Sequence, residues 1–377
     1  MPEIYSSIAC NLDAQILQAS LPLFEQEKVE AIEWSFDTLF KFNEIPVWFT
    51  DLVSEFSDHS RLIGHGVYFS LFSGKWTSGQ QEWLDKLQGL SLQFQFDHIT
   101  EHFGFMTGED FHKGAPISVP FTPQTLALGK DRLQRIQDAC KCPVGLENLA
   151  FSYSMDEVKK HGDFLAQLVE SVNGFIILDL HNIYCQVHNF NIDFDEIIKL
   201  YPLGRVREMH ISGGSWDETL VGPGRQVRRD THDEAVPEAV FELLQKAIPK
   251  CPNLKYVVME QMGTALDTAE RQAVFQSDFL RMDNIIKEIK TDFDPKITNT
   301  FGLLNRSAGT IPLEDQELHR QQLQLSHILE TAGSVSEAQA MLRSSDLHDT
   351  AWEVDKWAPY MLQTAISIAQ KWKNGFA

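Results

Sequence analysis

The chain contains eight short apolar or β-branched runs, most of them separated by stretches long enough for a helix. The runs begin at residues 8, 31, 62, 94, 144, 174, 206 and 256, and read IACNL, AIEWSF, LIGHGVYF, FQFDHITEHF, VGLENL, GFIILDLHN, VREMHISGG and YVVMEQM. Segments with the three- and four-residue apolar period of an amphipathic helix lie between them, as in 78–91, 123–140, 155–172 and 237–251. Strands that alternate with helices predict parallel βαβ units, and eight units predict a closed (β/α)8 TIM barrel of the α/β class.

After about residue 290 the pattern changes, because no further strand-like run occurs and helical segments take over. The stretch 290–312 is rich in Pro, Gly, Asn, Thr and Ser, which suits a connection between parts. A barrel needs roughly 250 residues, so this chain has room for more. We therefore expect a catalytic barrel over residues 1–290 and a helical C-terminal extension over residues 300–377.

Charge and cysteine content narrow the environment and the partners. The 32 Lys plus Arg face 53 Asp plus Glu, a formal net charge of −21, which repels nucleic acid and anionic membranes. Five scattered cysteines without a CxxC pair indicate a reducing compartment rather than a disulfide framework. The start lacks the features of a secretory signal, and no window approaches the ~18 apolar residues of a membrane span. We expect a cytoplasmic protein that binds neither nucleic acid nor membrane.

Oxygen and imidazole donors stand near the carboxyl ends of the runs, the face on which (β/α)8 barrels build their active sites. They are Glu33, His65, His102, Glu147, Asp179, Asn182, His210 and Glu260, joined by Asp230 and His232 from a DTH triplet after the seventh run. A carboxylate among apolar strand residues loses hydration and needs a compensating cation, yet few Lys or Arg stand there. Metal ions are the simplest compensation, and these donors suit Zn, Fe, Mn or Co without deciding among them.

Each of these residues also has an ordinary structural interpretation. A lone strand histidine such as His65 usually makes a structural hydrogen bond, Asp179 can cap the helix after it, and Asp230 can fix a turn. Nearly every strand end would need such an explanation at once, which favours a shared metal site. We expect His98, deeper along its strand, to belong to the core. The basic run 222–232 is expected as a loop, either solvated or closing over a ligand.

Across about residues 5–285 the chain resembles the multinuclear non-heme iron-dependent oxidases, a family long known as DUF692 with a xylose-isomerase-like barrel. The resemblance rests on HGVYFSL, TEHFGF, GLEN, LDLHNIYCQVHN, REMHISGG, DTH and VVMEQ. It implies two or three iron ions in mixed Fe(II)/Fe(III) states. The implied ligand sets are His65, His102 and Glu147; Glu147, Asp179, His210 and Glu260; and Asn182, Asp230 and His232. Glu147, which would bridge two irons, Asp179 and Asn182 are the residues we expect to take part in catalysis.

The resemblance also implies a reaction and its partners. Family members use iron, with dioxygen as co-substrate, to modify cysteine residues of ribosomally made precursor peptides, usually beside a small partner protein that grips the leader. Among the family's outcomes we favour excision of the cysteine β-carbon, in the branch that makes 3-thiaglutamate. Two departures stand out: IACNLD replaces an opening strand that usually reads close to GVGLR, and the extension over 300–377 is not general. That extension is either a partner dock or lid, or a packing cap.

Three rival functions share parts of this pattern. A trinuclear zinc phosphodiesterase of the endonuclease IV type has nearly the same donor order, but Asn182 stands where a histidine is expected and a charge of −21 suits DNA poorly. A sugar isomerase or epimerase with one or two Mn or Mg ions would not need the DTH triplet. A barrel that has lost catalysis and serves as a binding scaffold would not need the full donor set.

Overall fold

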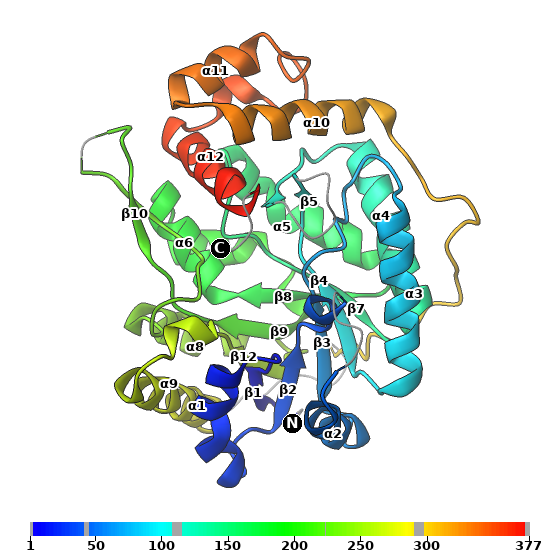
Figure 1. The fold of residues 1–377 in the computed structure, drawn as a ribbon, viewed down its shortest axis with the longest axis vertical. Coiled ribbons are helices and arrows are strands. Elements are labelled where there is room, and N and C mark those ends of the chain that lie inside the picture. The colour runs from blue at the N-terminus through cyan, green and yellow to red at the C-terminus, as the bar shows by residue number, and fades with distance from the viewer. Residues whose placement is uncertain (1–2, 41–44, 108–114, 223, 290–297, 374–377) are drawn as a thin grey trace.

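The computed structural model describes residues 3–40, 45–107, 115–222, 224–289 and 298–373. Its centre is a closed barrel of eight parallel strands in the order β1, β12, β9, β8, β7, β4, β3, β2 (Figure 1). These strands are β1 (Tyr5–Ala9), β2 (Ala31–Trp34), β3 (Leu62–Gly66), β4 (His98–Glu101), β7 (Val144–Glu147), β8 (Phe175–Asp179), β9 (Val206–Ile211) and β12 (Tyr256–Met259). The predicted (β/α)8 barrel is confirmed.

Helices and 3-10 turns surround the barrel and connect its strands (Figure 1). The α-helices are α1 (Ala14–Glu25), α2 (Val47–Asp58), α3 (Ser78–Gln93), α4 (Pro123–Cys140), α5 (Met155–Glu170), α6 (Leu180–Phe190), α7 (Phe194–Ile197), α8 (Glu238–Ala247) and α9 (Ala269–Glu288). The 3-10 turns are η1 (Phe36–Leu39), η2 (Ile198–Leu200), η3 (Leu203–Arg205), η4 (Ile248–Lys250) and η5 (Gly263–Ala265). Along the described residues, no helix combines the length and apolarity that crossing a membrane requires. All five cysteines are free and buried.

Every predicted run contributes a barrel strand, with shifts at the ends. The first strand begins at Tyr5 rather than residue 8 and pairs with β12 and β2, so the unusual opening sequence still closes the barrel. Two short antiparallel hairpins were not predicted: β5 (Phe105–Met106) with β6 (Pro116–Ile117), and β10 (Trp216–Glu218) with β11 (Gln226–Arg228). They follow β4 and β9, on the side of the barrel where the strands end.

Local chemistry explains why the predicted helices form where they do. Helix α4 coincides with the predicted 123–140, because Pro123 suits the first helical turn and Thr122 caps it through a hydrogen bond to the Thr125 backbone nitrogen. The predicted helix 237–251 is shorter, since α8 ends at Ala247 and a 3-10 turn follows. Pro249 lies in that turn and has no backbone N–H with which to continue an α-helix.

Along β2 and β3 the inward-facing side chains change from apolar to polar toward the carboxyl ends of the strands. Residues two apart on a strand share a face, so each strand stacks its inward side chains in layers. Ala31 and Ile63 belong to a fully buried apolar cluster, and Glu33 and His65 lie two residues further along the same strands. The polar layer therefore lies toward the carboxyl ends of the strands, where barrel active sites are found.

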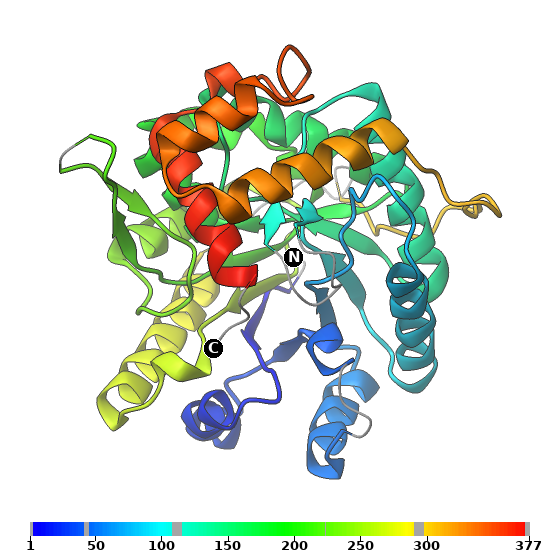
Figure 2. The ribbon, with the colours of Figure 1, turned by 45° about the horizontal axis from the view of Figure 1, so that its top comes forward.

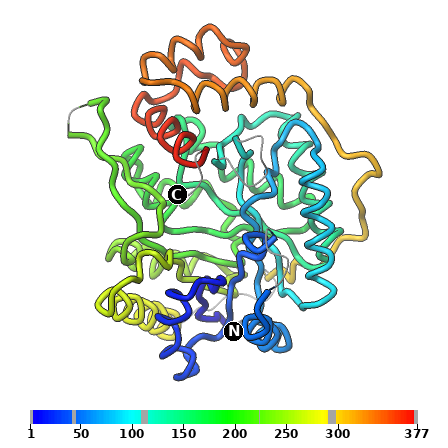
Figure 3. The backbone as a smooth tube through the Cα atoms, in the orientation of Figure 1, coloured from blue at the N-terminus to red at the C-terminus, as the bar shows by residue number. Residues whose placement is uncertain are grey.

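The C-terminal extension comprises α10 (Gln316–Thr331), α11 (Val335–Arg343), η7 (Val354–Lys356) and α12 (Pro359–Lys373), beside α5 and α6 (Figures 1 and 2). The preceding segment runs outside the barrel along α4, where Arg132 donates to the Leu313 carbonyl at 2.6 Å (Figure 3). The Trp357 ring stacks on Tyr153, after β7, with ring centroids 3.7 Å apart. The predicted domain ends at residues 1, 290 and 377, with part of the predicted connection, lie outside the described residues.

Candidate metal centre

The strand ends bring the predicted donors together in one cluster. The donors on or directly after barrel strands are His65 in β3, His102 after β4, Glu147 at the end of β7, Asp179 at the end of β8, His210 in β9 and Glu260 after β12. All of them except His102 are buried, and the His102 side chain is 28% exposed. The cluster is therefore largely shielded from water, with His102 at its open side.

His65, His102 and Glu147 form the first group. The Nε2 atoms of the two histidines lie 3.4 and 3.1 Å from Glu147 Oε2 and 3.2 Å from each other. His65 Nδ1 is hydrogen-bonded to the Thr100 hydroxyl at 2.8 Å, so its Nε2 is the nitrogen that faces the carboxylate. A hydrogen bond on the second ring nitrogen is the usual support of a metal-binding histidine. The structure thus gathers the predicted first ligand set, with its ligand atoms within 4.8 Å of one another.

The second group continues from the first without a gap. Ligand atoms of Glu147, Asp179 and His210 lie within 4.8 Å of one another, and so do those of Asp179, His232 and Glu260. His210 Nδ1 lies 3.1 Å from Glu260 Oε2, and His232 Nε2 lies 3.8 Å from the same oxygen. Glu147 and Asp179 are each shared between neighbouring groups. The four residues of the predicted second set are therefore linked through these groups, although no single group contains all four.

The predicted third set of Asn182, Asp230 and His232 is arranged less compactly. His232 Nε2 lies 2.8 Å from Asp230 Oδ1, and His232 holds a φ of 52°, a left-handed conformation that is unusual for a residue with a side chain. Asn182 instead donates its Nδ2 hydrogens to Glu147 Oε1 at 3.0 Å and to the Asn148 carbonyl at 2.8 Å. Its own oxygen, Oδ1, is buried without a hydrogen-bond partner. Among the contacts of the described residues, the Asn182 side chain thus meets the Glu147 carboxylate rather than Asp230 or His232.

Burial and mutual proximity perturb the protonation of these groups in the metal-free protein. Burial, with repulsion from Asp230 and Glu147, raises the pKa of Asp179 well above its usual range. Burial alone would also raise the pKa of Glu147, but hydrogen bonds with His102 and His65 outweigh it and lower that pKa. Burial opposes protonation of His102, yet the Glu147 carboxylate raises the His102 pKa to about 9. Metal binding must therefore compete with protons.

The donor set fits metal ions by its unsatisfied atoms as well as by its chemistry. Three buried oxygens of the cluster have no hydrogen-bond partner among the described residues: Glu33 Oε1, Asp179 Oδ2 and Asn182 Oδ1. Buried polar atoms are normally hydrogen-bonded, so this concentration in one cluster calls for an explanation. Imidazole and carboxylate donors without thiolate match Zn, Fe, Mn or Co.

Asp179 also caps the helix that follows it, which is its ordinary structural interpretation. Strand β8 ends at Asp179, and α6 begins at the next residue. Asp179 Oδ1 accepts a hydrogen bond from the Asn182 backbone nitrogen at 2.7 Å, which caps the helix. The cap uses one oxygen and leaves Oδ2 for the cluster, so the two interpretations are compatible.

A buried layer of Glu33, Glu208 and His98 lies beneath His210, and the sequence predicts only part of it. His210 Nε2 lies 3.2 Å from Glu33 Oε2 and 3.4 Å from Glu208 Oε1, while Glu208 Oε2 contacts His98 Nε2 at 2.8 Å. Glu33 was noted at a strand end without a ligand role, but its carboxylate lies within 4.8 Å of the ligand atoms of His210 and Glu260. Glu208 was missed, although its position two residues before His210 places both on one face of β9. His98 is fully buried, as expected of a core residue.

The prediction of a loop for 222–232 is wrong in part. Residues 226–228 form β11, which pairs with β10, and Arg228 is only 6% exposed. Its guanidinium lies 5.2 Å from the Trp216 ring centroid and 5.5 Å from that of Tyr184. An arginine on a strand can enter the protein interior once aromatic rings flank it, and no local sequence signal marks that pairing.

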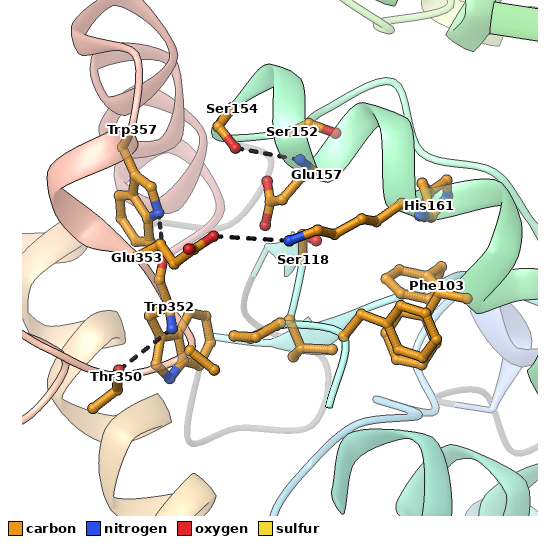
Figure 4. A pocket seen from close by; sticks show the side chains of 16 residues that line it. Phe103, Ser118, Ser152, Ser154, Glu157, His161, Thr350, Trp352, Glu353 and Trp357 are labelled. Atoms are coloured by element: carbon orange, nitrogen blue, oxygen red, sulfur yellow. Dashed lines mark hydrogen bonds and ion pairs between the residues drawn. The ribbon is translucent and has the colours of Figure 1, made fainter. Parts of the chain in front are cut away.

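A separate cavity of about 260 Å³ lies between the barrel and the extension (Figure 4). Phe103 and Trp357 contribute to its walls, and the Glu157 carboxylate points into it (Figure 4). Lys160 and Glu353 form an ion pair at 3.9 Å beside it. Burial raises the pKa of Glu157 to about 7. The predicted metal donors are not among the residues that line this cavity.

The barrel and its cluster of histidines and carboxylates define a TIM-barrel protein with a candidate metal centre at its strand ends. Within that class, the chain belongs to the family of RiPP precursor modification enzymes MbnB/TglH/ChrH, whose model matches residues 40–269. RiPPs are ribosomally synthesised, post-translationally modified peptides. The resemblance stated from the sequence is thereby confirmed at the level of the family. The matched region contains all the predicted metal ligands, and the C-terminal extension lies outside it.

Individual relatives and solved structures share low sequence identity with this chain. A UPF0276 protein of Caulobacter vibrioides is 28% identical over 185 residues, which cover 48% of this chain and 62% of the relative. A UPF0276 protein of Shewanella loihica is 25% identical over 195 residues, or 50% and 65% of the two chains. The match thus spans less than two thirds of these relatives.

Among solved structures, the zinc-bound IOLI protein has a TM-score of 0.48 at 12% identity, over 76% of this chain and 99% of that one. A xylose isomerase domain protein from Salmonella typhimurium has a TM-score of 0.48 at 10% identity, over the same shares of the two chains. At these scores neither similarity carries an argument about chemistry.

Proposed function

We propose that this chain is an iron- and dioxygen-dependent oxidase that modifies a cysteine residue of a ribosomally made precursor peptide. The observation that carries the proposal is the continuous donor cluster, in which Glu147 belongs both to the group with His65 and His102 and to the group with Asp179 and His210. Carboxylates shared in this way suit metal ions held side by side, as in two-metal active sites. Membership in a family of precursor-modifying enzymes supports a peptide as the substrate.

In this proposal each residue has a stated role. His65, His102 and Glu147 would hold the first iron, and Glu147, Asp179, His210 and Glu260 would hold the second. Asn182, Asp230 and His232 would hold the third. When bound, iron keeps a substrate thiol deprotonated and takes part in the reduction of dioxygen. The Asn182 amide holds Glu147 Oε1 at 3.0 Å and so orients the shared carboxylate. We place the entering substrate cysteine at the open side of the cluster near His102, because the His102 side chain is 28% exposed.

The outcome we propose is excision of the cysteine β-carbon, as in the branch that makes 3-thiaglutamate. The bonds of the β-carbon to the α-carbon and to sulfur break, and sulfur becomes bonded to the α-carbon. One dioxygen molecule balances the change, because the methylene group and both oxygen atoms together have the composition of formic acid. No external reductant is needed for this balance. A small partner protein that recognises the leader is proposed to present the peptide.

Metal analysis with Mössbauer and EPR spectroscopy on anaerobically purified protein tests the proposal. We expect more than one iron per chain in mixed oxidation states. Absence of iron from the purified protein would overturn the proposal. With a cysteine-bearing precursor peptide and air, the peptide should lose the mass of one methylene unit, and formate should be released. Glu147→Gln should lose both iron and turnover, because two groups share that carboxylate. Near-normal iron content and turnover in this variant would contradict the scheme.

The same preparation separates the rival functions, since the donor types alone do not choose between iron and zinc. Zinc in place of iron, together with incision of abasic duplex DNA, would support a phosphodiesterase of the endonuclease IV type. Manganese or magnesium with epimerisation of a free sugar would support the isomerase alternative.

A further inference from the structure

The C-terminal extension is linked to the predicted third metal group through a series of contacts that begins on α12. The Leu220 backbone nitrogen, at the β10–β11 hairpin, donates to Gln363 Oε1 at 3.0 Å. The Arg225 guanidinium lies over the Tyr360 ring, 3.5 Å from its centroid. Both α12 residues therefore hold the hairpin that rises beside α6 and α12 (Figure 1).

The second step passes through Asn189 near the end of α6. The Tyr360 hydroxyl donates to the Asn189 carbonyl at 2.7 Å, and Arg225 Nη2 donates to the same oxygen at 2.8 Å. The buried Asn189 side chain in turn bonds both backbone groups of Arg228, donating to its carbonyl at 3.0 Å and accepting from its nitrogen at 2.8 Å. These two hydrogen bonds fix the backbone of β11 at Arg228, whose side chain is buried.

The third step connects Arg228 to Asp230 through His181. Arg228 Nε donates to His181 Nε2 at 3.2 Å. A guanidinium has only donors, so Nε2 must be the accepting nitrogen and the ring proton must be on Nδ1. His181 Nδ1 then donates to Asp230 Oδ1 at 3.1 Å, the same oxygen that lies 2.8 Å from His232 Nε2. Arg228 and the Asp230 carboxylate thereby favour the same tautomer of His181, and the His181 ring orients Asp230.

The base of the hairpin is packed tightly against this histidine. A Cβ atom on Gly214 would approach His181 Cε1 to 2.9 Å and would collide with the Arg229 carbonyl. Asp230 and His232 lie two and four residues after β11 and belong to no strand or helix. The Met262 backbone nitrogen holds the His232 carbonyl at 2.8 Å, whereas Asp230 depends on the hairpin and on His181. The barrel strands alone do not place these two side chains.

We propose that the C-terminal extension positions the third metal group: α12 holds the β10–β11 hairpin, whose Arg228 fixes His181 and, through it, the Asp230 carboxylate. The inference rests on the proposed metal centre and adds a role for residues outside the matched region 40–269. His181 and Arg228 are positioning residues. Hydrogen bonds behind a metal ligand typically change metal affinity by about 10- to 100-fold.

A general packing role makes a different prediction, which a matched control can expose. Gln322 in α10 also anchors the extension, because its side chain donates to the Phe72 carbonyl at 2.7 Å and accepts from the Gly74 nitrogen at 2.8 Å. This anchor reaches the loop after β3 and has no link to Asp230. If the extension only stabilises the barrel, loosening either anchor should have the same effect.

The test compares the full-length wild type with Tyr360→Leu, Arg228→Met and the control Gln322→Met, titrated anaerobically with Fe(II). We expect the first two variants to bind the last iron about tenfold or more weakly while keeping the others, and the control to match the wild type even if it melts earlier. Unchanged iron affinity in both Tyr360→Leu and Arg228→Met would overturn the proposal. Equal weakening in the control Gln322→Met would also overturn it.

A second measurement tests the contacts from α12 to Asp230 in protein without iron. It separates failure of this proposal from failure of the proposed metal centre. NMR of metal-free protein with ¹⁵N-labelled histidine should show His181 protonated at Nδ1 in the wild type and in Gln322→Met. In Arg228→Met and Tyr360→Leu that preference should weaken. The same His181 tautomer in all four proteins would refute this proposal. Wild-type protein that binds no iron but shows the expected tautomers would instead refute the proposed function alone.

Discussion

Replacing Asp179 with asparagine should stabilise the metal-free protein while removing its response to metal. The Asp179 carboxylate is fully buried and its Oδ2 has no hydrogen-bond partner. Burial, with repulsion from Asp230, Glu147 and Glu260, raises its pKa well above the usual range. Asparagine keeps the helix cap on α6, because asparagine and aspartate are equally good at this position. The substitution therefore removes an unfavourable charge without removing the cap.

The gain comes from removing a buried charge, because asparagine still places a polar atom at the Oδ2 position. We take the cost of leaving a buried polar group unsatisfied, about 1–3 kcal/mol, as the scale of the effect. Unfolding entropy is about 2 cal/mol/K per residue, so for a chain of this length each kcal/mol moves Tm by about 1 °C. We expect the metal-free variant to melt about 1–4 °C above the wild type. Metal at about one hundred times Kd should stabilise the wild type by about 2.7 kcal/mol. The variant should lose most of that gain, because two donor groups share Asp179.

The assay is thermal unfolding of chelator-treated protein, with and without Fe(II) under anaerobic conditions. The gap between the metal-free proteins should be absent below about pH 4, where the carboxyl is neutral in both states, and should widen as pH rises toward its raised folded-state pKa. Asp13→Asn is the matched control, since Asp13 caps α1 through bonds to the Gln15 and Ile16 nitrogens and lies outside the cluster. A metal-free Asp179→Asn that melts below the wild type, or keeps the full metal shift, would refute this reasoning.

Three further outcomes are expected. Metal affinity of the first group should rise about tenfold per pH unit up to about pH 9, because Glu147 raises the His102 pKa to about 9 against the effect of burial; a pH-independent Zn(II) titration would count against this. Burial lowers the pKa of His161 to about 3, so stability should fall by about 1.4 kcal/mol per unit as pH drops below about 6.5. Urea unfolding of His161→Gln should show a shallower acid dependence, and an equal slope would contradict it. Trp357→Ala removes the stack on Tyr153 and should cost about 3–5 kcal/mol, seen as faster proteolysis of the extension; unchanged resistance would show that other contacts hold it.

The barrel could be predicted because its signals are local. Strands covered on both faces are continuous apolar runs, and helices such as α4 carry their caps at Thr122 and Pro123. The hairpins β5–β6 and β10–β11 could not be predicted in the same way. Their strands are two or three residues long, too short to show a period, and each depends on a partner across a loop.

The gathering of the candidate donors on the strands could be predicted, because parallel topology alone brings strand ends to one face. Their supporting partners could not. Glu208 meets His98 across 110 positions of sequence, and Arg228 meets His181 across 47. Such pairs depend on the register of neighbouring strands and on the docking of a hairpin, neither of which is encoded near the residues concerned.

The amino-acid sequence by itself determined the closed barrel, the polar ends of its strands and the family to which the chain belongs. Only the tertiary structure decided that Asp179 joins two donor groups, that Asn182 is bonded to Glu147, and that Asp230 is held from α12 through Arg228 and His181. The physical reason is distance. Strand periodicity places a side chain on a face, whereas ligand and hydrogen-bond contacts of about 3 Å require the closed barrel and the docked extension together.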